Sequence, residues 1–141
     1  MIYLDSSALM KLIREEAETA ALSAWLAPQT EIPIVTSELG RVEVLRAARR
    51  AGPEVLTEAR AVIGDLDLVP LDRGVQDLAC DVGSASLRTL DALHLASAVL
   101  LRDELSAFVA YDHRLVDAAR VAGLPITTPT TPRAESPQSP E

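Results

Sequence analysis

The chain opens with Met1-Ile2-Tyr3-Leu4-Asp5-Ser6-Ser7-Ala8-Leu9, and this stretch decides how the rest of the sequence is interpreted. Its apolar start predicts a short buried strand over residues 2–4, with Asp5 at the carboxyl end. In open α/β sheets, ligands bind just beyond the carboxyl ends of the strands, so a carboxylate there is a candidate for chemistry. The structural alternative is that Asp5 caps a helix beginning at Ser6. The opening residues alone leave both interpretations open.

The composition predicts a single α/β domain with an aliphatic core. A length of 141 residues suits one hydrophobic core. Hydrophobic residues make up 48% of the chain but aromatic ones only 3%, which favours helices packed on a short aliphatic sheet. The single cysteine, Cys80, excludes an internal disulfide.

The sequence also predicts a cytoplasmic protein without a membrane span. No secretory signal precedes the first expected strand. The most apolar stretch, 90–101, is interrupted by Asp91, His94 and Ser97, and is shorter than the roughly 18 residues that a spanning helix needs.

The net charge of −8 argues against a simple binder of nucleic-acid backbones, because such proteins normally present a basic surface. A role on nucleic acid would therefore need a bound divalent metal or a basic partner chain. A metal ion can reverse the local electrostatics of a carboxylate cluster.

Apolar runs of strand length alternate with helical periodicity over residues 1–127, which predicts a three-layer α/β/α domain with a short, mainly parallel sheet flanked by helices. Residues 128–141 are rich in Thr, Pro and Ser, and we expect a disordered tail. The expected strands are 2–4, 31–36, 66–71, 107–111 and 124–126. The expected helices are 8–14, 15–26, 38–50, 53–63, 73–83, 89–101 and 113–123.

Three acidic residues stand in unusual surroundings. Asp5 and Asp112 each follow an apolar strand, whereas Asp91 interrupts the most apolar helix, where an unpaired carboxylate would cost several kcal/mol. Asp91 can be compensated by the N-terminus of its own helix, by Arg88, or by a cation shared with other carboxylates. Glu43 is less distinctive, because an exposed glutamate near Arg46 would look the same.

Four acidic residues and their neighbours together resemble the signature of the PIN-domain nucleases. The segments are Tyr3-Leu4-Asp5-Ser6-Ser7, Glu43-Val44-Leu45-Arg46-Ala47, Leu90-Asp91-Ala92-Leu93-His94-Leu95-Ala96 and Val109-Ala110-Tyr111-Asp112. More narrowly, the chain is similar to the VapC-type toxins of type II toxin–antitoxin pairs. The resemblance runs from Met1 to about Ile126.

The resemblance implies a PIN-like fold and a metal-dependent endoribonuclease. It implies that Asp5, Glu43, Asp91 and Asp112 are the catalytic and metal-binding residues, holding Mg²⁺ or Mn²⁺, and that Ser7 supports a metal ligand or a water. It also implies a homodimer, restrained by a small DNA-binding antitoxin whose C-terminal segment covers the acidic cleft. Hard oxygen ligands do select such cations, and carboxylate-bound metal can drive phosphodiester cleavage.

Further side chains are open to two interpretations. An arginine stripe on one helix either grips RNA or forms a solvated, salt-bridged face: Arg41, Arg46, Arg49 and Arg50. His94 is expected to be a core or hydrogen-bonded histidine rather than a metal ligand, because no His-rich zinc pattern is present. His113 either reaches the site or only begins a helix.

Two other functions remain open. An aspartyl phosphatase or phosphotransferase would use Asp5 but would want a second acid two residues later, where Ser7 stands. A non-catalytic module would use the same carboxylates only to receive a partner's arginines.

Overall fold

Five short strands and seven α-helices follow one another along residues 1–132, the part of the chain that the computed structural model describes. The strands are β1 (Ile2–Leu4), β2 (Ile34–Ser37), β3 (Asp67–Val69), β4 (Ala107–Val109) and β5 (Ile126–Thr127). The helices are α1 (Ser6–Ile13), α2 (Thr19–Leu26), α3 (Glu38–Ala51), α4 (Pro53–Gly64), α5 (Arg73–Asp81), α6 (Thr89–Leu100) and α7 (His113–Val121).

The strands form one sheet in the order β3-β2-β1-β4-β5, and all four pairings are parallel. The chain leaves β1 toward β2 and β3 on one side, then crosses to β4 and β5 on the other. The order therefore reverses between β1 and β4, whose ends are in register at Leu4 and Val109. Open α/β sheets bind ligands at such a switch point. The predicted parallel fold is confirmed.

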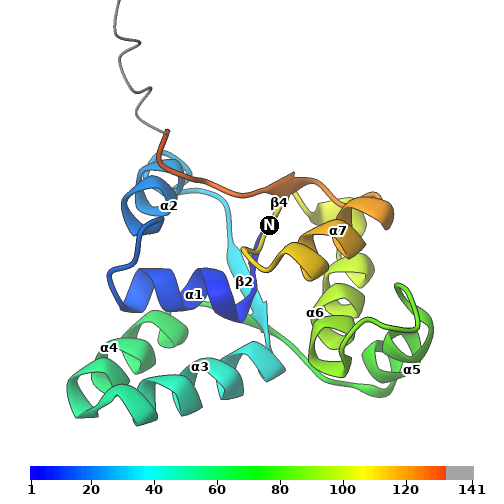
Figure 1. The fold of residues 1–141 in the computed structure, drawn as a ribbon, viewed down its shortest axis with the longest axis horizontal. Helices are drawn as coiled ribbons and strands as arrows, with labels where there is room; N and C mark the ends of the chain where they lie inside the picture. The colour runs from blue at the N-terminus through cyan, green and yellow to red at the C-terminus, as the bar shows by residue number, and fades with distance from the viewer. Residues whose placement is uncertain (133–141) are drawn as a thin grey trace, which may run out of the picture.

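The two faces of β1 point to two groups of helices, since successive strand residues face opposite sides. Ile2 and Leu4 pack with α1–α4, whereas Tyr3 packs with α6 and α7. Figure 1 shows these groups on either side of the strands, with α1–α4 on the left and α5–α7 on the right. The aliphatic core predicted from the composition is thus split into two layers.

Polar residues at the strand–helix junctions begin four of the helices. A side-chain oxygen accepts a hydrogen bond from a backbone N–H of the first helical turn, as N-caps do. These residues are Asp5, Ser37, Asp72 and Asp112. The cap that the sequence offered as one interpretation of Asp5 is thus present, and each helix entry is fixed close to a strand end.

Several predicted element boundaries differ from the structure by one or two residues, and the starts of α2 and β2 differ by more. The helix expected from residue 15 begins only at Thr19, because the Thr19 hydroxyl donates to the Lys11 carbonyl oxygen and accepts from the Glu16 N–H in a turn. The strand expected from residue 31 begins at Ile34, because residues before it turn and Ile32 donates to the Gln29 carbonyl oxygen. Both errors lie where side-chain or turn bonds replace the regular pattern.

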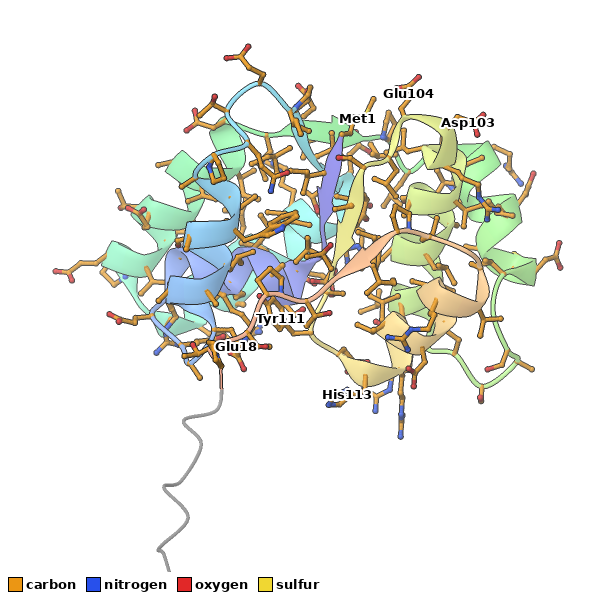
Figure 2. All side chains as sticks on the ribbon, turned by 90° about the horizontal axis from the view of Figure 1, so that it is seen from above. Met1, Glu18, Asp103, Glu104, Tyr111 and His113 are labelled. Atoms are coloured by element: carbon orange, nitrogen blue, oxygen red, sulfur yellow. The ribbon has the colours of Figure 1, made fainter. Side chains whose placement is uncertain are left out.

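The last described residues, 128–132, contain no helix or strand. The Tyr111 hydroxyl donates to the Pro129 carbonyl oxygen at 2.7 Å, so the chain passes over Tyr111 after β5 (Figure 2). The rest of the predicted tail, 133–141, lies outside the described residues. None of the helices between residues 1 and 132 combines the length and apolar content needed to cross a membrane.

Gly40 lets α3 lie close to the sheet. A Cβ atom at this position would lie 2.6 Å from Thr36 Oγ1 and 3.2 Å from His94 Cε1. Thr36 cannot give way easily, because it is buried and its hydroxyl donates to the Leu4 carbonyl oxygen. Only glycine fits here without displacing a neighbour.

Gly40→Ala is therefore expected to lower the free energy of unfolding. Alanine improves helix propensity by about 1 kcal/mol, but overpacking a core contact costs about 1–3 kcal/mol. We expect a net loss of about 1 kcal/mol, measured by urea denaturation. Thr36→Ala removes the closest contact, so the same Gly40→Ala change should cost less in that background. An equal cost in both backgrounds would contradict the packing explanation.

Candidate active site

Asp5 lies at the carboxyl end of β1, and its residue is only 3% exposed. Its Oδ1 accepts hydrogen bonds from the Ala8 N–H at 2.9 Å and from the Ser7 hydroxyl at 2.7 Å. Within the described residues no hydrogen bond uses Oδ2. Since no buried side-chain oxygen there lacks a partner, Oδ2 must be open to solvent. Asp5 therefore caps α1 through Oδ1 and leaves Oδ2 without a hydrogen bond in the described part of the chain.

Burial raises the pKa of the Asp5 carboxyl, and the negative charge of Glu43 raises it further. The hydrogen bonds from Ser7 and Ala8 and the nearby His94 act in the opposite direction. The Ser7 hydroxyl also accepts from the Tyr111 N–H at 3.1 Å, which ties α1 to the end of β4. Ser7 thus fixes the orientation of the Asp5 carboxyl.

Glu43 lies on α3, and its side chain is 26% exposed. Its Oε1 is 2.6 Å from His94 Nε2 and accepts a hydrogen bond from the Ser6 hydroxyl at 3.1 Å. The alternative of an exposed glutamate paired with a neighbouring arginine is wrong for this residue. Glu43 is turned toward the end of β1.

Asp91 is the third residue of α6 and is only partly buried. Burial raises the pKa of its carboxyl, followed by the charge of Asp112; Glu43 raises it further, while His94 and Arg88 lower it. Within residues 1–132 no ion pair joins Asp91 to Arg88, so this arginine acts on Asp91 only through its charge. Of the three compensations left open by the sequence, the helix N-terminus is present, because Asp91 lies in the first turn of α6. The negative charges that raise its pKa are those of Asp112 and Glu43.

Asp112 caps α7, and its Oδ1 accepts from the Arg114 and Leu115 N–H groups at 3.0 and 3.2 Å. It is exposed, which leaves the carboxylate accessible beside Asp91. His113 next to it is the first residue of α7 and projects away from the fold (Figure 2). His113 therefore only begins a helix.

The mutual repulsion of charges links all four predicted acidic residues: Glu43 raises the pKa of Asp5 and of Asp91, and Asp112 raises that of Asp91. Across the described part of the chain, no three His, Cys, Asp or Glu side chains already stand as a ready-made metal cluster. Asp5 and Asp112 follow strands, and Glu43 and Asp91 reach them from α3 and α6, close enough for their charges to act on one another.

A groove of about 630 Å³ runs beside Glu43 between α1 and α3. Arg46 and Arg50 line it, together with Ser6 and Ser7 from the start of α1. All four predicted arginines are exposed, but Arg41 and Arg49 do not line this groove. The structure thus divides the predicted arginine stripe into two that border the site and two that do not.

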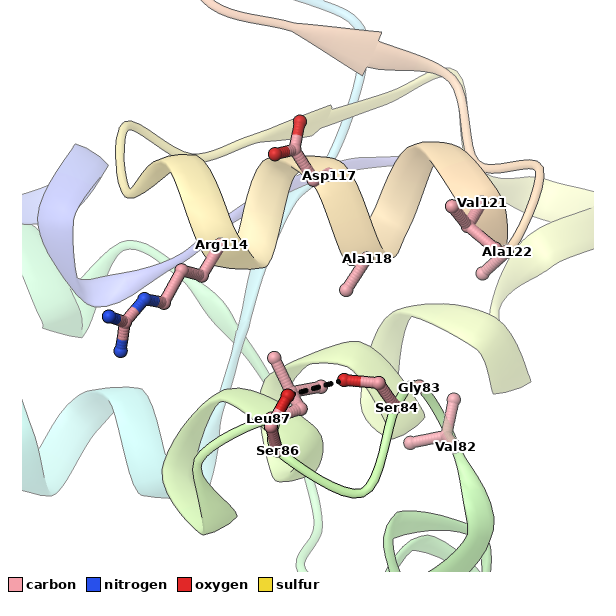
Figure 3. Close-up of a pocket in the computed structure, with 10 residues that line it drawn as sticks. All are labelled: Val82, Gly83, Ser84, Ser86, Leu87, Arg114, Asp117, Ala118, Val121 and Ala122. Atoms are coloured by element: carbon pink, nitrogen blue, oxygen red, sulfur yellow. Dashed lines mark hydrogen bonds between the residues drawn. The ribbon is translucent and has the colours of Figure 1, made fainter.

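A second, larger hollow of about 800 Å³ lies between α7 and the loop around Gly83 (Figure 3), and none of the four carboxylates lines it. Its walls are mainly apolar, with Val82, Leu87 and Ala118 among them. The larger of the two hollows is therefore not the one that Glu43 borders.

Family membership follows from the whole chain and not from the acidic residues alone. Residues 2–121 match the model of the PIN domain. The chain belongs to the PIN-domain family. Among curated relatives of this PIN domain is Ribonuclease VapC47 of Mycobacterium tuberculosis, 46% identical over 92% of this chain and 97% of the relative. Ribonuclease VapC35 of the same species is 42% identical over the same shares. The chain is therefore a VapC-type PIN domain.

Solved structures share the fold of this PIN domain at low sequence identity. VapBC2 of Rickettsia felis, bound to a promoter DNA fragment, gives a TM-score of 0.68 at 12% identity and covers 91% of this chain and 98% of its own. VapC20 of Mycobacterium tuberculosis, described as a toxin that cleaves the sarcin–ricin loop, gives 0.66 at 17% identity over 84% and 95%. These likenesses confirm the predicted fold.

Sequence reasoning missed two contacts of this PIN domain. His94 was expected to be buried and hydrogen-bonded, which is confirmed, but its contact with Glu43 was not foreseen. The Ser6 contact with Glu43 was missed as well. One signal was available: His94 follows Asp91 by three residues, a spacing that places both on one face of a helix.

Proposed function

We propose that this chain is a metal-dependent endoribonuclease and the toxin of a type II toxin–antitoxin pair, acting in the cytoplasm. The observation that carries the proposal is the group of acidic residues at the β1–β4 switch point, in a chain related to VapC ribonucleases. Asp5, Glu43, Asp91 and Asp112 are the proposed catalytic and metal-binding residues. The expected ions are Mg²⁺ and Mn²⁺.

The donor set fits a hard divalent cation. It consists of carboxylate oxygens only, which is the chemistry that Mg²⁺ and Mn²⁺ prefer. Asp5 Oδ2 remains free while Oδ1 takes the Ser7 and Ala8 hydrogen bonds. A bound cation would also remove the repulsion that raises the pKa of Asp5 and Asp91. We infer that the carboxylates move closer together when the ion binds.

The residues of the proposed site have different roles in phosphodiester cleavage. When bound, the cation neutralises the phosphate, activates water and stabilises the leaving oxygen. The four carboxylates would hold it beside the carboxyl end of β1, and Ser7 fixes the orientation of Asp5. Arg46 and Arg50 border the groove and would hold the RNA backbone beside the carboxylates.

Cleavage of structured RNA by the purified full chain tests the proposal. We expect cleavage with Mg²⁺ or Mn²⁺, none with a chelator, and a loss in Asp91→Asn. Asparagine keeps the size of the side chain but removes the charge that would bind the cation. Cleavage by Asp91→Asn equal to that of the wild type would contradict the assignment.

Arg46→Gln/Arg50→Gln is expected to weaken RNA binding without removing cleavage at saturating RNA. Each lost phosphate contact should reduce the slope of log K against log salt by roughly 0.7 for single-stranded RNA. Fluorescence anisotropy at several salt concentrations measures this slope. The matched control is Arg41→Gln/Arg49→Gln, whose residues do not line the groove. An equal loss in the control would contradict the groove as the RNA path.

The proposed partners are RNA, a second copy of the chain, and a cognate antitoxin. One fold neighbour is described as a toxin–antitoxin complex from Klebsiella pneumoniae, and another is VapBC2 of Rickettsia felis bound to promoter DNA. The charge of −8 suits an antitoxin segment with basic side chains. We propose that this segment covers the acidic residues and blocks RNA. The test uses a small DNA-binding protein encoded by a neighbouring open reading frame. Its co-purification with this chain, and loss of RNA cleavage when it is added, would support the proposal.

A further inference from the structure

A buried hydrogen-bonded chain connects the central strand to one of the proposed metal ligands. The Tyr3 hydroxyl lies 2.7 Å from His94 Nδ1, and His94 Nε2 lies 2.6 Å from Glu43 Oε1. Tyr3 is completely buried, and His94 is 2% exposed. The three residues come from β1, α6 and α3, so the chain joins both layers of helices to the sheet.

The direction of donation at the Glu43 end of this chain follows from the carboxylate. Carboxylate oxygens only accept hydrogen bonds, so His94 Nε2 carries a proton and donates to Glu43 Oε1. The Ser6 hydroxyl donates to the same oxygen. The Tyr3 hydroxyl contacts the other ring nitrogen, Nδ1, and so fixes the orientation of the ring.

The imidazole ring has little freedom to move. Tyr3 stacks on Phe108 with ring centroids 5.3 Å apart and meets the His94 ring edge-on at 6.0 Å. On the other side, the backbone of α3 at Gly40 comes so close that a Cβ atom would lie 3.2 Å from His94 Cε1. The donor that Glu43 meets is thus fixed by the core.

We propose that His94, locked by Tyr3, is a positioning residue that orients Glu43 as a metal ligand, an inference that rests on the proposed function. His94 and Ser6 both bind Oε1, and no hydrogen bond within residues 1–132 uses Oε2. Oε2 is therefore the oxygen available to the cation. Partners that orient a ligand are typically worth about 10- to 100-fold in metal affinity or activity.

The experiment measures Mn²⁺ affinity by calorimetry, kcat and KM for RNA cleavage, and thermal unfolding of the full chain. His94→Leu keeps the bulk but removes both ring nitrogens, and we expect about 10- to 100-fold weaker Mn²⁺ binding, a similar fall in kcat and an unchanged KM. His94→Gln retains an N–H donor near Nε2 and should restore most of the affinity. Tyr3→Phe keeps the stacking ring and should cause a smaller loss.

A double-mutant cycle separates positioning from a general effect on the fold. In a Glu43→Ala background there is no carboxylate to orient, so His94→Leu should weaken Mn²⁺ binding no further. Leu95→Ala, a buried neighbour on α6, is the control for destabilisation. If His94→Leu fails to fold, His94→Gln and Tyr3→Phe decide the question.

Two results would overturn the inference: wild-type Mn²⁺ affinity and kcat in folded His94→Leu, or the same loss in the Glu43→Ala background. In both cases the proposed function stands as long as Glu43→Ala itself weakens Mn²⁺ binding and cleavage. Wild-type Mn²⁺ binding and cleavage in Glu43→Ala would instead remove Glu43 from the site and contradict both.

Discussion

Asp5→Asn is expected to lower RNA cleavage by at least about 100-fold and to make the folded protein more stable. Removing a residue that only orients a metal ligand typically lowers activity by about 10- to 100-fold. Asp5 is itself a proposed ligand, so its replacement should lower cleavage by at least the upper value. The gain follows from burial, which raises the pKa of the Asp5 carboxyl and so makes its ionised form unfavourable in the folded state. Asparagine removes that charge and keeps an oxygen that accepts from the Ala8 N–H.

The stability difference should depend on pH. Because the pKa of Asp5 is higher in the folded than in the unfolded protein, the penalty is complete above the folded pKa. The penalty disappears as the pH falls from the pKa of Asp5 in the folded protein to its pKa in the unfolded protein. Denaturation of wild type and Asp5→Asn without divalent cation should therefore give the largest difference near neutral pH and converging values in acid.

Asp72→Asn is the matched control for this prediction. Asp72 also caps a helix through Oδ1, which accepts from the Val75 N–H at 3.0 Å, but it belongs to α5 and not to the acidic site. Its replacement should change neither cleavage nor the pH dependence. Retained cleavage by Asp5→Asn, or a stability below that of the wild type at neutral pH, would contradict the role given to Asp5.

Mn²⁺ is expected to raise the thermal unfolding temperature of the wild type by roughly 10 °C at a concentration 100 times its Kd. Binding at that excess stabilises the folded state by about 2.7 kcal/mol, and a chain of this size gains roughly 3–4 °C per kcal/mol. The cation also relieves the repulsion among Asp5, Glu43, Asp91 and Asp112. Mg²⁺ should act in the same direction.

Scanning calorimetry with and without Mn²⁺ measures this shift, with potassium chloride at matched ionic strength as the salt control. Asp5→Asn and Asp91→Asn should lose most of the shift, because each removes a proposed ligand. Asp72→Asn should retain it. An equal shift in all variants would indicate binding elsewhere on this acidic protein.

The fold was largely predictable because residues within or next to each element indicate it. Asp5 and Asp112 end apolar strands, and Ser37 and Asp72 stand as caps before helical periodicity, so the order of elements follows from near neighbours. The boundaries were less predictable. The delayed start of α2 depends on Thr19 bonding to Lys11, eight residues earlier, and no periodic pattern reports such a bond.

The candidate site was predictable in its residues but not in its contacts. The four carboxylates were recognised from their local segments. The contact between His94 and Glu43 spans 51 positions and requires the crossing of α3 and α6 at Gly40. A contact between residues so far apart in the sequence leaves no local pattern. From the sequence, a neighbouring arginine was therefore as good a partner for Glu43 as His94.

The central place of β1 has a consequence for how the protein is made on the ribosome. β1 is synthesised before the other four strands of the sheet, yet it pairs with β4, whose residues emerge more than 100 positions later. Pairings of such long range form late and slowly. Asp112 follows β4, so the acidic residues meet only when most of the chain has been translated. A growing chain that has not yet reached Asp112 would thus lack one of the four carboxylates of the proposed site.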